Sequence, residues 1–172
     1  ILRSSKNPAL RLATFRTMGA TLYTFGRFQE AVDAMKPGLE EFPEDVEMLN
    51  NTSFMLSKKL NNPALALPLA ERAAKLAPTN ADVLDTLGVT LLLVGRAADA
   101  EVQLRQALSN PSSPQSEITI AVHLIDALLK QQKTEEAKQL ATKAQEFIAR
   151  LGAQADPAIV AELQQLRTTG GI

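Results

Sequence analysis

The chain has 172 residues, of which 45% are apolar and only 4% aromatic, with no Cys or Trp and a net charge of −1. The lack of Cys excludes disulfides, thiolate chemistry and Cys-ligated zinc. The interspersed charges argue against a nucleic-acid-binding protein, which usually carries a basic stripe, and no apolar run reaches the ~18 residues that a membrane helix needs. A core of aliphatic side chains favours packed helices over a β-sandwich.

The first ten residues contain no apolar signal-peptide region. Residues 1–11 are expected to be the tail of a preceding repeat that closes at Pro8, so the sequence is interpreted as a fragment of a longer chain. The compartment, cytoplasmic or periplasmic, is not distinguished by the composition.

Small residues recur at a fixed interval along the chain. One column lies 35, 34 and 37 residues apart, at Ala31, Ala66, Ala100 and Ala137. A second column lies seven residues further along, at Gly38, Ala73, Ala107 and Ala144. These columns predict four repeats, at 12–45, 46–80, 81–114 and 118–151.

The first half of each repeat carries its own pattern, with large apolar residues around a small one. Repeat one reads Phe15-x2-Met18-Gly19-x2-Leu22, and repeat three reads Leu84-x2-Leu87-Gly88-x2-Leu91. The small residue lets two helices approach closely. In repeat two this position is Ser53, which requires one extra residue, assigned here to the turn at 60–64. In repeat four it is Ile125, which predicts a wider helix separation.

The recurring pattern resembles the tetratricopeptide repeat (TPR) family, in its bacterial type, with aliphatic residues in place of the usual aromatics. The resemblance covers about residues 12–151 and implies an all-α, right-handed solenoid of four helix-turn-helix repeats. A capping helix is predicted at about 156–168, with Asp156 as its N-cap and Pro157 at its first position.

The polar residues provide no set of groups for catalysis. His123 has neither a second His nor a Cys as partner and is interpreted as a helix-surface or groove-lining side chain. Five carboxylates lie within residues 40–47 but lack the spacing of a calcium loop, so they are interpreted as a solvated helix start. No catalytic, metal or cofactor site is predicted, and the protein is not expected to be an enzyme.

The resemblance implies that the first helix of each repeat lines a concave groove that binds a protein segment or peptide. An apolar strip in this groove is predicted from Phe54, Val89, Leu92 and Leu129, because exposed apolar stripes usually mark interaction surfaces. The predicted groove residues are Arg16, Tyr23, Asn50, Phe54, Lys58, Asp85, Val89, Leu92, Asp126 and Leu129. The alternative is a structural assembly module that packs on itself, through its N-terminal end, or on an upstream domain.

Overall fold

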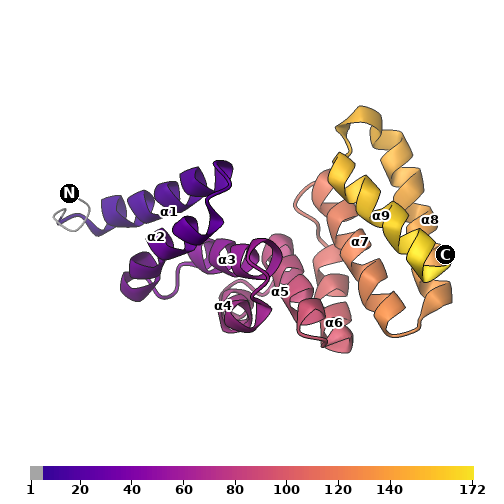
Figure 1. Cartoon of the computed structure of the whole chain (residues 1–172), viewed down its shortest axis with the longest axis horizontal. Coiled ribbons are helices and arrows are strands. Elements are labelled where there is room, and N and C mark those ends of the chain that lie inside the picture. The colour runs from indigo at the N-terminus through magenta and orange to yellow at the C-terminus, as the bar shows by residue number, and fades with distance from the viewer. Residues whose placement is uncertain (1–5) are drawn as a thin grey trace. The chain divides into compact units, whose positions relative to one another are not determined.

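The computed structural model describes residues 6–172, in which all regular structure is helical. The described chain forms two compact units that divide between Pro78 and Thr79. Figure 1 follows the helices from α1, in indigo, to α9, in yellow.

The first unit contains two helix pairs. Its helices are α1 (Pro8–Thr24), α2 (Phe28–Glu41), α3 (Val46–Phe54) and α4 (Pro63–Leu76), and α3 continues into a π-helical turn, η2 (Met55–Lys59). Helix α2 packs on both α1 and α3, and α4 packs on α3 and η2.

Helix α1 begins four residues before residue 12, the expected start of the first repeat. The Asn7 Oδ1 atom accepts hydrogen bonds from the backbone N–H groups of Ala9 (3.0 Å) and Leu10 (3.4 Å). Pro8 therefore opens α1 as its first residue and does not close a preceding repeat, which corrects the sequence-based assignment. Residues 1–5 of the expected tail lie outside the described residues.

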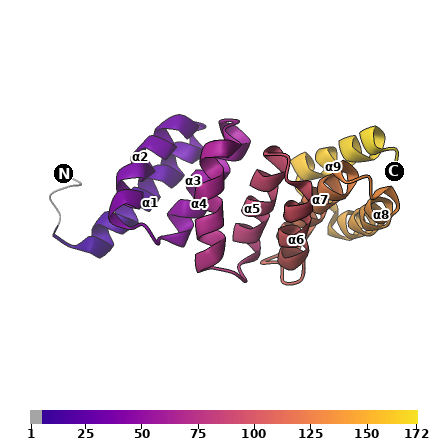
Figure 2. The same cartoon turned by 90° about the horizontal axis from the view of Figure 1, so that it is seen from below.

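The second unit contains two further helix pairs and a terminal helix. Its helices are α5 (Ala81–Leu93), α6 (Ala97–Leu108), α7 (Pro114–Lys130), α8 (Thr134–Leu151) and α9 (Pro157–Gly170), with a short 3-10 turn, η3 (Gly152–Gln154), before α9. Helix α7 contacts α5 and α6 on one side and α8 and α9 on the other, and α9 also packs on α8 (Figure 2).

Each helix pair turns at one residue in the left-handed backbone conformation. These residues are Gly26 (φ 71°), Asn61 (φ 50°), Gly95 (φ 83°) and Gln132 (φ 61°). Each precedes the repeated alanine by five residues. Two of the four are glycines, which adopt this conformation without the strain that a Cβ atom introduces.

The extra residue of the second pair lies in η2, a few positions before the expected turn at 60–64. In the third pair the Arg96 N–H donates to the Leu91 carbonyl, five residues earlier, at 2.8 Å, whereas the Asn62 N–H reaches back six residues to Leu56 at 2.7 Å. A π-helical turn accommodates one more residue than an α-helical turn. The insertion is therefore absorbed at the end of the first helix, before the turn.

The two helices of a pair match in volume where they meet. A Cβ atom on Gly19 would lie 1.9 Å from the Met35 Cε atom, and one on Gly88 would lie 2.5 Å from the Leu104 Cγ atom, so each glycine makes room for a large side chain on the second helix. In the fourth pair the sizes are exchanged, because Ile125 on the first helix corresponds to Ala141 on the second, and both are buried. The small Ala141 leaves room for Ile125, and the wider helix separation expected there stays a prediction.

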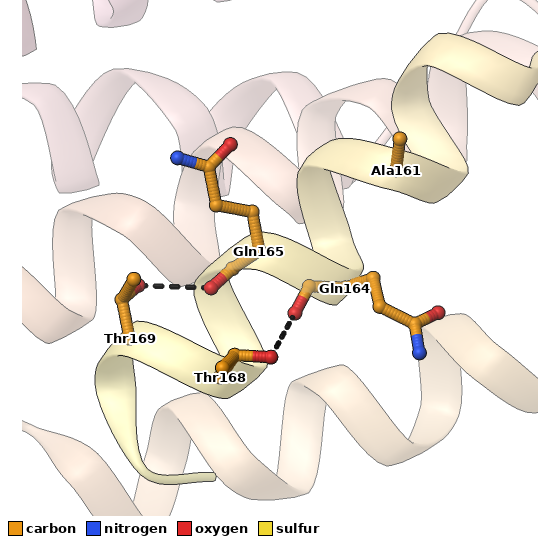
Figure 3. Close-up of a pocket in the computed structure, with 5 residues that line it drawn as sticks. All are labelled: Ala161, Gln164, Gln165, Thr168 and Thr169. Atoms are coloured by element: carbon orange, nitrogen blue, oxygen red, sulfur yellow. Dashed lines mark hydrogen bonds between the residues drawn. The ribbon is translucent and has the colours of Figure 1, made fainter.

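The C-terminal helix α9 has the expected cap and a polar outer face. Asp156 accepts a hydrogen bond from the Ala158 N–H at 2.8 Å, and Leu163 is buried. Figure 3 shows the outer depression of α9, which is lined by this one helix, at Ala161, Gln164, Gln165, Thr168 and Thr169. The Thr168 hydroxyl donates to the Gln164 carbonyl at 3.0 Å. Polar side chains on the outer face suit a terminal helix of a repeat array.

Candidate functional site

An aromatic cluster lies in the first unit, formed by Tyr23, Phe28 and Phe54. The Tyr23 ring centroid is 5.5 Å from that of Phe28 and 6.3 Å from that of Phe54, and the ring planes are tilted by 58° and 56°. Tilted rings at these separations are a favourable arrangement of aromatic quadrupoles. The aromatic cluster thus brings rings from three helices together.

The local fold accounts for this convergence. Tyr23 lies near the end of α1, Phe28 is the first residue of α2 and Phe54 is the last residue of α3. The inner side of Phe54 packs on a buried core of Ala31, Met35 and Met55. Tyr23 is 38% exposed, so one edge of the aromatic cluster faces solvent.

A fourth aromatic side chain, Phe25, follows Tyr23 in the turn between α1 and α2 and is 74% exposed. The chain has seven aromatic residues, six Phe and one Tyr. More than half of them therefore lie in the aromatic cluster or in the adjoining turn.

Lys59 completes the cluster with a positive charge. Its Nζ atom lies 5.6 Å from the ring centroids of both Phe28 and Phe54, within the range of a cation–π interaction. Lys59 is exposed, and no carboxylate of the described chain lies within salt-bridge distance of it. By contrast, Arg16 and Arg27 of the same unit pair with acidic side chains.

Five of the acidic residues of this unit lie at the other end of α3, at 40–47. Asp45 caps α3 by accepting a hydrogen bond from the Met48 N–H at 2.9 Å, which confirms the predicted helix start. Arg11 pairs with Glu41 at 2.5 Å, and Arg16 pairs with Asp45 and, at 2.8 Å, with Glu47. The first unit is thus acidic where α3 begins and basic where η2 ends.

The first unit contains five of the predicted groove residues, and the structure brings two of them together, Tyr23 and Phe54. Lys58 is exposed in η2, beside Lys59. Arg16 is engaged by Asp45 and Glu47, and the Asn50 Oδ1 atom is buried without a hydrogen-bond partner among the described residues.

In the second unit the predicted groove residues are largely packed. Val89 and Leu92 are 6% and 7% exposed, and helical spacing places them on the same face of α5 as Asp85, which contacts α7. Leu129 lies under α9, where a Cβ atom on Gly170 would be 2.7 Å from its Cδ1 atom. Asp126 pairs with Lys130 at 2.6 Å. Val89, Leu92 and Leu129 therefore do not form the open apolar strip expected from the sequence.

His123 does not lie on the helix surface, which is one of the two positions expected from the sequence. It is buried, and its Nδ1 atom lies 2.7 Å from the Asp85 Oδ1 atom, so the pair joins α7 to α5. A buried polar side chain needs such a partner, and Asp85 supplies it from the neighbouring repeat.

Glu101 is a buried acidic residue of the second unit whose pKa is strongly lowered. Burial by itself raises the pKa of Glu101, but hydrogen bonds from Lys133 (2.6 Å), Arg105 (2.8 Å) and Gln131 (2.7 Å) outweigh it and lower the pKa to about 2. These contacts tie α6 to the turn between α7 and α8.

Sequence reasoning missed two members of the site, Phe28 and Lys59. The available signal was the concentration of scarce aromatic residues at 23–28 and 54, next to a pair of lysines at 58 and 59. Within residues 6–172 no three His, Asp or Glu side chains gather as metal ligands. None of the described helices is long and apolar enough to cross a membrane.

No protein-family model matches the sequence, and no curated protein matches it. Solved structures do match the fold. A MamA double mutant from strain RS-1 shares 22% identity at a TM-score of 0.74, with 88% of this chain and 81% of that chain covered. PilF of Pseudomonas aeruginosa shares 19% identity at a TM-score of 0.74, covering 95% and 71%.

A putative kinesin light chain of Podospora anserina, described by its nearly identical TPR-like repeats, shares 16% identity at a TM-score of 0.72, covering 97% of this chain and 90% of that chain. These similarities, at low identity, concern the fold. They confirm the expected all-α fold class, and the chain has the fold of tetratricopeptide-repeat proteins.

Proposed function

We propose that this protein is an interaction scaffold and that its first unit binds a segment of a partner protein at the aromatic cluster. One observation carries the proposal: rings from α1, α2 and α3 converge at an exposed edge beside an ammonium group that has no acidic partner within residues 6–172. Aromatic side chains with a polar neighbour are typical of residues that dominate binding energy at interfaces.

The physical argument concerns the exposed edge of the cluster. Tyr23 and Phe25 keep 38% and 74% of their surface in contact with water. Covering this aromatic surface with a partner's apolar side chain releases free energy in proportion to the apolar area removed from water. The rings of Tyr23, Phe28 and Phe54 already contact one another, so little further side-chain entropy is lost when a partner covers them.

This proposal keeps part of the groove predicted from the sequence. Tyr23, Phe54 and Lys58 lie at or beside the cluster, whereas Val89 and Leu92 are packed within the second unit. A continuous groove that includes Asp85, Asp126 and Leu129 stays a prediction. A non-catalytic role is part of the proposal.

The test is a direct affinity measurement with a partner captured by site-specific crosslinking. A photoreactive phenylalanine analogue at Phe25 captures proteins that approach the cluster, and each purified partner is then titrated against variants. We expect Tyr23→Ala and Phe54→Ala each to weaken binding by at least ~1 kcal/mol, about fivefold.

Phe147→Ala is the matched control. Phe147 is a half-buried ring of the second unit with the Arg150 guanidinium 5.2 Å from its centroid, so it reproduces the chemistry of the cluster at another place. Tyr23 is exposed, so its variant keeps the fold even if Phe54→Ala does not. A captured partner that binds Tyr23→Ala as tightly as the wild type refutes the proposal.

A specific observation favours a second function, self-association through α1. This helix carries an apolar crevice of about 310 Å³ on one face, and the neighbouring Leu10 is 57% exposed. The crevice is lined by Thr14, Thr17, Met18, Thr21 and Leu22. In a repeat array an uncovered apolar helix face is stabilised by stacking on another repeat.

A further inference from the structure

Lys59 differs from three arginines of the first unit in how its charge is balanced. Arg11, Arg16 and Arg27 each pair with a carboxylate, whereas the Lys59 Nζ atom contacts two aromatic ring faces. A ring quadrupole attracts a cation but accepts no hydrogen bond from its N–H donors on the solvent side, which therefore donate to water. A group with a negative charge is the natural ligand for those donors.

Resting on the proposed function, we infer that the segment bound at the aromatic cluster is acidic and that Lys59 selects it. The segment places an apolar side chain on the rings and a carboxylate on the Lys59 ammonium. The π-helical turn η2 is the structural element that brings this ammonium to the rings.

The role of η2 follows from its register. In the second pair the segment from Leu56 to the left-handed residue Asn61 is one residue longer than the corresponding segment of the third pair, from Leu91 to Gly95. Each residue advances an α-helix by ~100°, so removing one residue from η2 rotates the following side chain away from its present direction. The insertion thus sets which lysine faces Phe28 and Phe54.

The surrounding charges favour an anion over a cation as the ligand. Lys58 adjoins Lys59 in the same turn, and five acidic residues of the unit lie at the other end of α3, at 40–47. Glu30, the acidic residue nearest to Phe28 in the chain, pairs with Arg27 at 2.5 Å. Asp33 and Glu71 lie further along α2 and α4. A cationic side chain approaching the rings would displace Lys59 and meet the repulsion of its ammonium group. An acidic side chain gains from the same field.

The contacts with the rings also lower the cost of binding a carboxylate. A free lysine side chain loses considerable rotamer freedom when it forms an ion pair. Lys59 is already held 5.6 Å from two ring centroids, so part of this loss is incurred in the unbound protein.

The test uses three synthetic peptides with the same central phenylalanine, flanked by Glu, Gln or Lys. Each is titrated against the whole chain by isothermal calorimetry at low and high salt. We expect the Glu peptide to bind best and to lose its advantage at high salt, because exposed charges are screened. Lys59→Gln should weaken the Glu peptide by about two- to fivefold, the range of one exposed ion pair, and leave the Gln peptide unchanged.

Three further variants give the controls. Lys59→Arg should keep the preference for Glu, and Lys75→Gln, which removes an exposed lysine of α4 in the same unit, should have no effect. Deleting Lys58, with retained helicity as the criterion of folding, should abolish the preference. Lys59→Gln keeps the inference testable if the deletion variant does not fold.

The outcomes separate the two proposals. If all three peptides bind equally and Tyr23→Ala weakens all of them, the aromatic cluster is a binding site but the acidic preference is wrong. Tightest binding of the Lys peptide also overturns the inference, since the ligand would then replace Lys59 on the rings. If no peptide binds, or if Tyr23→Ala leaves binding unchanged, the proposed function fails, and the inference fails with it.

Discussion

Replacing Gly88 by Leu tests the volume matching between the helices of a pair. A Cβ atom at this position would lie 2.5 Å from the Leu104 Cγ atom and 2.7 Å from its Cδ2 atom. Overpacking of this kind costs about 1–3 kcal/mol, with the upper end expected here because three further carbons follow the Cβ atom. The better helix propensity of Leu returns less than ~1 kcal/mol, so a net loss of about 2 kcal/mol is expected.

A second replacement makes the test specific for packing. Leu104→Ala alone leaves a cavity and should cost about 2–5 kcal/mol. The double variant, Gly88→Leu with Leu104→Ala, has a large side chain on the first helix and Ala on the second, as in the natural pair Ile125 and Ala141. It should therefore be at least ~1 kcal/mol more stable than the sum of the single losses predicts.

The free energies come from urea unfolding followed by far-ultraviolet circular dichroism. Gly95→Ala is the reference, because a Cβ atom there meets nothing within 4 Å and the φ of 83° alone opposes it, at a cost of about 1 kcal/mol. Strict additivity of the two single variants would refute the packing argument. A larger loss for Gly95→Ala than for Gly88→Leu would refute the placement of Gly88 at a close helix contact.

Three more predictions follow from individual contacts. Glu101→Gln should lower the free energy of unfolding by about 1–3 kcal/mol at neutral pH. The folded-state pKa of Glu101 is lowered from 4.5 to about 2, so its contribution to the free energy of unfolding is complete above pH 4.5 and is lost as the pH falls toward 2. The free energies of unfolding of the wild type and the variant should therefore converge over that pH range. Thr17→Asp, in the α1 crevice, should raise the dissociation constant of any self-association by at least about tenfold in sedimentation equilibrium, and an unchanged constant would exclude this face. Asn61→Gly should raise the free energy of unfolding by about 0.5–1 kcal/mol, measured as a higher urea midpoint, because Asn61 has a φ of 50° and glycine adopts this conformation with less strain. A lower midpoint would show that the Asn side chain stabilises the turn.

The repeats and their helices could be predicted from local information. The small-residue column that includes Ala31 and Ala100 lies in the second helix of each pair, and Asp156 caps the last helix as expected. Periodicity of this kind is a property of one helix face, so it can be observed without knowing the neighbour.

The volume of the partner helix could not be predicted in the same way. Ile125 has a size that contradicts the local pattern, whereas the corresponding residue of the second helix, Ala141, is small, and both are buried. His123 likewise lies in the interior because Asp85, from another helix pair, supplies its hydrogen bond. In both cases the environment of a side chain depends on a residue far away in the sequence.

The candidate site shows the same division. The sequence by itself determined that Tyr23 and Phe54 lie on first helices and that the second repeat carries one extra residue. Only the tertiary structure decided that this residue forms a π-helical turn and that Lys59 lies over Phe28 and Phe54. The physical reason is that the direction of a side chain after an insertion depends on where the helix absorbs it. The packing of three helices determines where the extra residue is absorbed, and the local sequence pattern does not show this position.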